Sequence, residues 1–132
     1  PGLFGGLTAV APGRFSITIN FVRSEAYSSP AQLLKRAIAG YWPVTWVVRQ
    51  ALDEDLTFKA AVKRLKSLPL LAPVLFAVAG VDSDEGVVIE RQPDDAKLRR
   101  IKDGAAFCTN HYVSMAFIDD NQEKPALPEE TG

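Results

Sequence analysis

The chain has 132 residues, of which 47% are hydrophobic and 23% charged, a composition typical of a globular domain. Its 15 basic and 16 acidic residues give a formal net charge of −1, so it lacks the net positive charge typical of proteins that bind nucleic acid or an anionic membrane. No apolar run reaches the roughly 20 residues that cross a bilayer. We therefore expect one domain with no nucleic-acid partner and no transmembrane segment.

The chain contains one cysteine, Cys108, and one histidine, His111. A lone cysteine excludes an intrachain disulfide, and this pair cannot build a protein-only zinc site of the usual kind. We expect no metal and no cofactor. The chain begins at Pro1, without a methionine or a signal-peptide pattern, which indicates a processed or trimmed start and leaves the compartment open.

The first predicted elements form a β-hairpin over residues 3–20. Residues 3–10 are apolar and glycine-rich, and Pro12-Gly13 provides a turn. In the following segment, apolar and polar residues alternate from Arg14 to Asn20, which is typical of a half-buried strand.

Three helices are predicted over residues 29–68. Ser29 caps the first helix, Pro43 opens the second and Thr57 caps the third. Gly40 and Pro69 supply stop signals for the first and the third. Each of the last two helices has an apolar stripe, formed by Val44, Val47, Val48 and Ala51, and by Phe58, Ala61, Val62, Leu65 and Leu68. The basic residues Lys59, Lys63, Arg64 and Lys66 are interpreted as the solvated face of the third helix.

Four strands are predicted after the helices, at residues 74–80, 86–91, 96–101 and 105–110. The first is continuously apolar, as expected for a strand covered on both faces. The order ββ-ααα-ββββ predicts an α+β layered sandwich. We expect residues 1–118 to form the domain, with strands over 74–110, and residues 119–132 to form an extended polar tail.

Four stretches resemble the acid ceramidase and N-acylethanolamine acid amidase family. They are colinear over roughly residues 3–112. In order, they are Gly6–Asn20, then Pro43–Arg49 with Phe58–Val62, then Leu71–Pro73 through Gly80 to Glu85–Arg91, and finally Thr109-Asn110.

The resemblance implies part of an αββα sandwich of the N-terminal-nucleophile (Ntn) hydrolase kind, within the choloylglycine hydrolase superfamily. In such enzymes a cysteine freed by self-cleavage attacks an amide carbonyl, with its own α-amino group as base. The Thr-Asn motif implies that Asn110 stabilises the oxyanion. As candidates for binding a small-molecule N-acyl amide substrate, the resemblance suggests Asn20, which ends the hairpin strand near the polar site, and His111, which follows Asn110 directly.

The sequence departs from the family pattern at several positions. Phe21 replaces a glutamate expected after Asn20, and Asn121 and Gln122 replace arginines expected after an Asp-Asp pair. Thr109-Asn110-His111 looks more like relatives of the isopenicillin N acyltransferase kind. The family's nucleophile, and the arginine and aspartate that follow it, lie upstream of the hairpin. We therefore expect residues 1–132 to be inactive alone and to pair with the rest of a longer chain or with a homo-oligomer partner.

Each candidate residue also has a structural interpretation. Asn110 could cap a strand end through local backbone hydrogen bonds. His111 could be an ordinary loop histidine, although its usual pKa would suit a general base. Cys108 is expected to be an apolar filler rather than a nucleophile. The acidic stretch 82–85 is interpreted as a hairpin turn rather than a calcium loop.

Two functions remain open at this point. The first is an amidase that hydrolyses a linear carbon–nitrogen bond in an N-acyl amide with an apolar acyl chain. The second is a binding or structural module without catalysis on the same scaffold, since a fold does not fix a function. The replaced residues at Phe21, Asn121 and Gln122 favour the second function.

Overall fold

The computed structural model describes residues 6–22, 29–54, 56–102 and 104–114 of the chain. The predicted tail at 119–132, with Asn121 and Gln122, lies outside the described residues, and so do residues 3–5 of the predicted hairpin.

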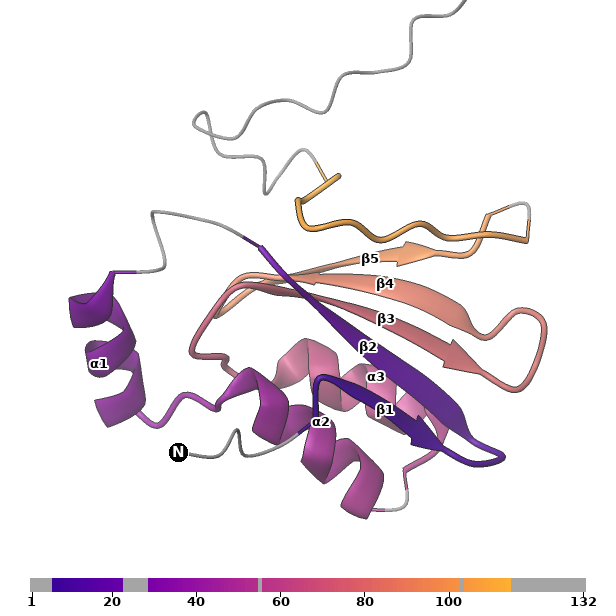
Figure 1. Cartoon of the computed structure of the whole chain (residues 1–132), viewed down its shortest axis with the longest axis horizontal. Helices are drawn as coiled ribbons and strands as arrows, with labels where there is room; N and C mark the ends of the chain where they lie inside the picture. Colours follow the sequence, from indigo (N-terminus) through magenta and orange to yellow (C-terminus); the bar gives the residue numbers. More distant parts are fainter. Residues whose placement is uncertain (1–5, 23–28, 55, 103, 115–132) are drawn as a thin grey trace, which may run out of the picture.

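The described residues form an α+β fold with three helices and one antiparallel sheet (Figure 1). The strands are β1 (Thr8–Ala11), β2 (Phe15–Phe21), β3 (Val74–Gly80), β4 (Gly86–Arg91) and β5 (Ala96–Arg100). The helices are α1 (Pro30–Ile38), α2 (Val44–Asp53) and α3 (Phe58–Ser67). The strands lie in the sheet in chain order, β1-β2-β3-β4-β5. This confirms the predicted fold class, with the helices inserted between two groups of strands.

The two groups of strands join into one sheet because β2 pairs with β3 along its whole length. Phe15 lies opposite Gly80 and Phe21 opposite Val74. The predicted turn at Pro12-Gly13 joins β1 to β2, and Gly13 has a φ of 71°, a left-handed conformation that glycine adopts without a steric penalty.

The helix boundaries follow the predicted capping residues. The Ser29 hydroxyl accepts a hydrogen bond from Gln32 N, and the Thr57 hydroxyl accepts one from Ala60 N. Pro43 is the N-cap of α2, and Gly40 follows α1 with a φ of 82°. These local signals mark where the helices begin and where α1 ends.

The core lies between the sheet and two of the helices, α2 and α3, which cover one face of the sheet (Figure 1). The predicted stripe of α2 is buried, and in α3 the buried members of the stripe are Phe58, Ala61 and Leu65. These side chains pack against Phe15 and Ile17 of β2, Val74, Phe76 and Val78 of β3, and Val87 and Ile89 of β4. Helix α1 buries no residue. A helical layer on one sheet is one half of an αββα sandwich.

Two expectations were wrong. Residues 105–110 form no fourth strand after the helices: apart from an isolated bridge between Lys102 and Ala105, this part of the described chain has no ladder. Strand β3 is also not covered on both faces along its length, since Leu75 is buried but Ala77 is only half-buried and Ala79 exposed. The acidic stretch 82–85 does form the turn between β3 and β4, as predicted.

Candidate active site

The candidate site lies on the face of the sheet opposite α2 and α3. There, residues 104–114 run beside β5 and across the sheet (Figure 1). We call residues 107–114 the crossing segment. Side chains from three strands, rather than a backbone ladder, bind this segment to the sheet. They are Asn20 of β2, Glu90 of β4 and Arg99 of β5.

Glu90 is the most deeply placed of these side chains, with 0% of its surface exposed. Its carboxylate accepts a hydrogen bond from Arg99 Nε at 2.6 Å. It also accepts backbone hydrogen bonds from Val113 N at 3.1 Å and Ser114 N at 2.9 Å. A buried carboxylate is costly unless it is paired and hydrogen-bonded, and here both oxygens have donors. The C-terminal end of the crossing segment is therefore bound to a buried charge.

The N-terminal end of the crossing segment is bound through its carbonyl groups. An Arg99 terminal nitrogen donates to Phe107 O at 3.0 Å. The Asn20 side-chain amide lies 3.5 Å from Cys108 O and 3.4 Å from Thr109 O, long distances that indicate weak hydrogen bonds. The structure thus brings Asn20 next to the Thr-Asn motif, where it holds backbone.

Asn110 lies between these two sets of anchors. Its side chain is exposed, and it makes no side-chain hydrogen bond within the described part of the chain. An asparagine that capped a strand end would satisfy nearby backbone groups. Its amide N–H groups instead remain available to a ligand, as an oxyanion donor requires.

His111 is half-buried next to Asn110. The Thr109 hydroxyl lies 3.3 Å from both ring nitrogens, so it can hydrogen-bond with either one, depending on the tautomer. This contact holds the imidazole close to its own loop. The structure therefore brings the three predicted site residues, Asn20, Asn110 and His111, into one region of the sheet face.

Cys108 packs into a small apolar cluster with Val22, Leu75 and Tyr112. Burial raises the pKa of its thiol; nearby Glu90 also raises this pKa, and Arg99 lowers it. The reactive form of cysteine is the thiolate, which a raised pKa makes scarce at neutral pH. Both features favour the apolar-filler interpretation of Cys108.

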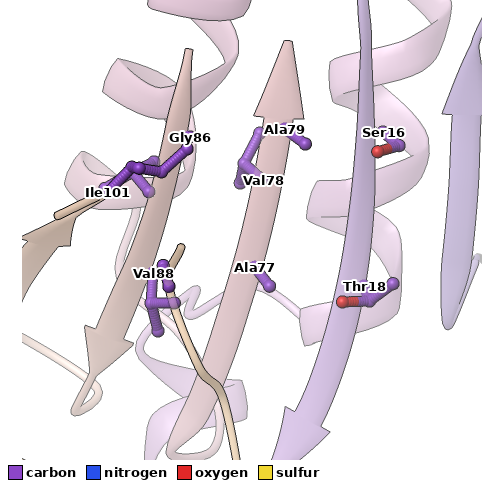
Figure 2. Close-up of a pocket in the computed structure, with 10 residues that line it drawn as sticks. Ser16, Thr18, Ala77, Val78, Ala79, Gly86, Val88 and Ile101 are labelled. Atoms are coloured by element: carbon purple, nitrogen blue, oxygen red, sulfur yellow. The ribbon is translucent and has the colours of Figure 1, made fainter. Parts of the chain in front are cut away.

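A hollow of about 260 Å³ adjoins the crossing segment on the same face. Figure 2 shows Ser16 and Thr18 on β2 and Ala77 and Ala79 on β3 at this hollow. Gly86 also lines it, and a Cβ there would collide with the Ile101 side chain. The small side chains leave this part of the sheet open, on the face where an αββα sandwich places its second sheet.

Among the residues that the structure describes, no three His, Cys, Asp or Glu side chains are grouped so that they could hold a metal ion. Within the same residues, no helix is both long and apolar enough to cross a membrane.

Glu90 and Arg99 were not among the residues predicted for the site. Glu90 stands near the end of an otherwise apolar strand, where a charged residue usually marks the strand's exposed end. The sequence signal was a lone glutamate at the end of one predicted strand and the basic residues of the next; the register that brings Arg99 opposite Val88, two positions from Glu90, is visible only in the structure.

One helical layer on one antiparallel sheet is the layout of part of an Ntn-type hydrolase. No family model matches the chain. Over 52 residues it is 44% identical to the N-acylethanolamine-hydrolyzing acid amidase of Mus musculus, an alignment that covers 39% of this chain and 14% of that protein. Over 97 residues it is 31% identical to the acid ceramidase of Heterocephalus glaber, covering 72% and 24% of the two chains.

The fold is similar to a solved structure of the Caenorhabditis elegans N-acylethanolamine-hydrolyzing acid amidase ortholog, with a TM-score of 0.64 and 26% identity. That match covers 76% of this chain and 43% of the other. The chain spans about a quarter or less of the length of the curated relatives named above. These similarities confirm the predicted resemblance to the acid ceramidase and N-acylethanolamine acid amidase family.

Proposed function

We propose that the full-length protein containing this chain hydrolyses the carbon–nitrogen bond of an N-acyl amide with an apolar acyl chain. The observation that carries the proposal is the exposed amide of Asn110, which has no hydrogen-bond partner among the described residues and lies on a segment bound to the sheet at both ends. The names of the relatives support the substrate class, since one acts on N-acylethanolamines and another is a ceramidase.

In this mechanism the Asn110 side-chain N–H donates a hydrogen bond to the oxyanion that forms when the amide carbonyl is attacked. The donor contributes to rate because the negative charge develops only in the transition state. His111 and Asn20 border the substrate position, with Asn20 acting mainly through the backbone that it holds. The hydrolysis needs no metal or cofactor in this scheme.

In this proposal the nucleophile lies outside residues 1–132, as the family resemblance implies. Cys108 is a poor candidate, because its raised pKa keeps the thiol protonated. Residues 1–132 alone are therefore expected to show no turnover, because without a nucleophile only a residual effect from the oxyanion donor remains.

The test is the release of fatty acid, measured by mass spectrometry, from an N-acylethanolamine and from a ceramide incubated with the full-length protein. Residues 1–132 alone and the full-length Asn110→Asp variant are run in parallel. The proposal predicts release by the wild-type full-length protein and little by the other two. If the wild-type protein binds these lipids without releasing fatty acid, it is a non-catalytic binding module instead.

A further inference from the structure

Residues 106–109, which lead to Asn110, have no regular backbone hydrogen bonding. Phe107 is 80% exposed, so apolar packing of its side chain does not fix this part of the chain. A segment without a ladder or a packed side chain keeps its position only through its remaining contacts. On the crossing segment, those contacts are the side chains of Asn20, Glu90 and Arg99 together with the apolar cluster of half-buried Cys108 and buried Tyr112, whose hydroxyl also donates to Arg91 O at 2.5 Å.

The guanidinium of Arg99 connects the two ends of the crossing segment. One of its nitrogens donates to Phe107 O, three residues before Asn110. Its Nε donates to Glu90, and the same carboxylate binds the N–H groups of Val113 and Ser114. One ion pair therefore binds the backbone on both sides of Asn110.

The ion pair between Glu90 and Arg99 lies in a largely buried environment, where electrostatic interactions are little screened by solvent. Glu90 is completely buried, and the side chain of Arg99 is only 25% exposed. Hydrogen bonds with one charged partner are stronger than neutral ones, and the low exposure limits screening by solvent. By comparison, the neutral contacts of Asn20 with the same segment are at 3.4 and 3.5 Å.

We propose that Glu90 and Arg99 are positioning residues that fix the backbone on both sides of Asn110 and thereby aim its side-chain amide. The part of this inference that concerns catalysis rests on the proposed amidase function. Neither residue touches the reacting atoms. Misplacing a catalytic group by about 1 Å can cost about 100-fold in rate, so loss of the pair should lower kcat by about 10- to 100-fold.

The experiment compares the full-length wild-type protein with Glu90→Gln, Arg99→Gln and the double variant. Arg100→Gln is the matched control, because Arg100 is the adjacent arginine, is exposed, and projects from the other face of β5. Hydrogen–deuterium exchange of peptides covering residues 104–114 reports the anchoring without any need for activity. Measurements of kcat and KM report the positioning, and thermal midpoints identify variants that are unfolded.

The expected result is faster exchange in residues 104–114 for both single variants, with kcat lowered and KM within about twofold, and with Arg100→Gln unchanged. Because the two residues act as a unit, the double variant should lose little more than either single variant. If Glu90→Gln fails to fold, Arg99→Gln at the more exposed position carries the test.

If hydrogen–deuterium exchange in residues 104–114 is the same in Glu90→Gln, Arg99→Gln and the wild-type protein, the ion pair does not anchor the crossing segment. If exchange in residues 104–114 is faster but kcat is unchanged, the ion pair anchors the segment but does not position the Asn110 side chain for catalysis. A wild-type protein that releases no fatty acid would overturn the proposed function and the catalytic part of this inference, while the exchange data would still decide whether the ion pair holds the segment.

Discussion

Replacement of Asn110 by alanine distinguishes the two interpretations of this residue. The asparagine side chain is exposed and has no hydrogen-bond partner among the described residues, so its removal leaves no buried group unsatisfied. Exposed substitutions of this kind usually change the free energy of unfolding by less than about 0.5 kcal/mol. The thermal midpoint of Asn110→Ala should therefore stay close to that of the wild-type protein.

The effect on catalysis should be much larger. Removal of one oxyanion donor typically lowers kcat by about 10²- to 10³-fold, or roughly 3–4 kcal/mol of transition-state stabilisation. The loss should fall on kcat rather than on KM, because the substrate carbonyl carries little charge before attack. Asn110→Asp has nearly the same shape but replaces the donor with a carboxylate that repels the oxyanion, so it should be at least as impaired.

Both variants are assayed in the full-length protein by initial rates of fatty acid release over a range of substrate concentrations, together with thermal unfolding. A strand-capping asparagine predicts the reverse pattern, with about 1–3 kcal/mol of stability lost and activity per folded molecule retained. A lowered midpoint with kcat within a few-fold of the wild-type value would therefore refute the oxyanion role.

Two further predictions concern buried groups. The pKa of the Cys108 thiol is raised, so less thiolate is present at any given pH. The rate of alkylation by iodoacetamide should therefore be low at neutral pH and increase only above the ordinary cysteine pKa of roughly 8.5. Cys108→Ala should keep kcat and lose about 1 kcal/mol of stability in urea unfolding, and loss of turnover would contradict the filler interpretation. The Arg91 side chain donates to the carbonyls of Lys66, Leu68 and Pro93. Arg91→Met should therefore lower the free energy of unfolding by roughly 3–5 kcal/mol, because three carbonyl acceptors lose a charged donor. This is a net loss, since the cost of burying the guanidinium disappears at the same time. An unchanged unfolding midpoint would show that these hydrogen bonds contribute little to stability.

The elements that were predicted correctly depend on local signals. Ser29 and Thr57 cap helices through bonds that span three residues, and the stripe of α2 repeats at the helical period. The strands β3 and β4 lie where continuous apolar runs placed them. The pairing of β3 with β2 across the helices depends on contacts between distant residues, which no local pattern encodes.

The incorrect strand at 105–110 has a related cause. Short segments of this composition are compatible with a strand, but in this one the carbonyls of residues 107–109 accept hydrogen bonds from side chains of β2 and β5. Asn110 was predicted as a site residue through the Thr-Asn motif, a prediction still to be tested, whereas Glu90 was not predicted because its partners are 9, 23 and 24 residues away along the chain. A contact of that kind becomes visible only when the fold is known.

The most direct measurement of the central claim is to locate the acyl group in an acyl-enzyme. The full-length protein is incubated with an N-acyl amide, quenched in acid during turnover, digested, and analysed by mass spectrometry for a peptide carrying the mass of the acyl chain. Covalent amide hydrolysis predicts that this peptide lies outside residues 6–114 and that the amount trapped falls in Asn110→Asp. An acyl group on Cys108, or no acyl group on any peptide together with no release of fatty acid, would contradict the account.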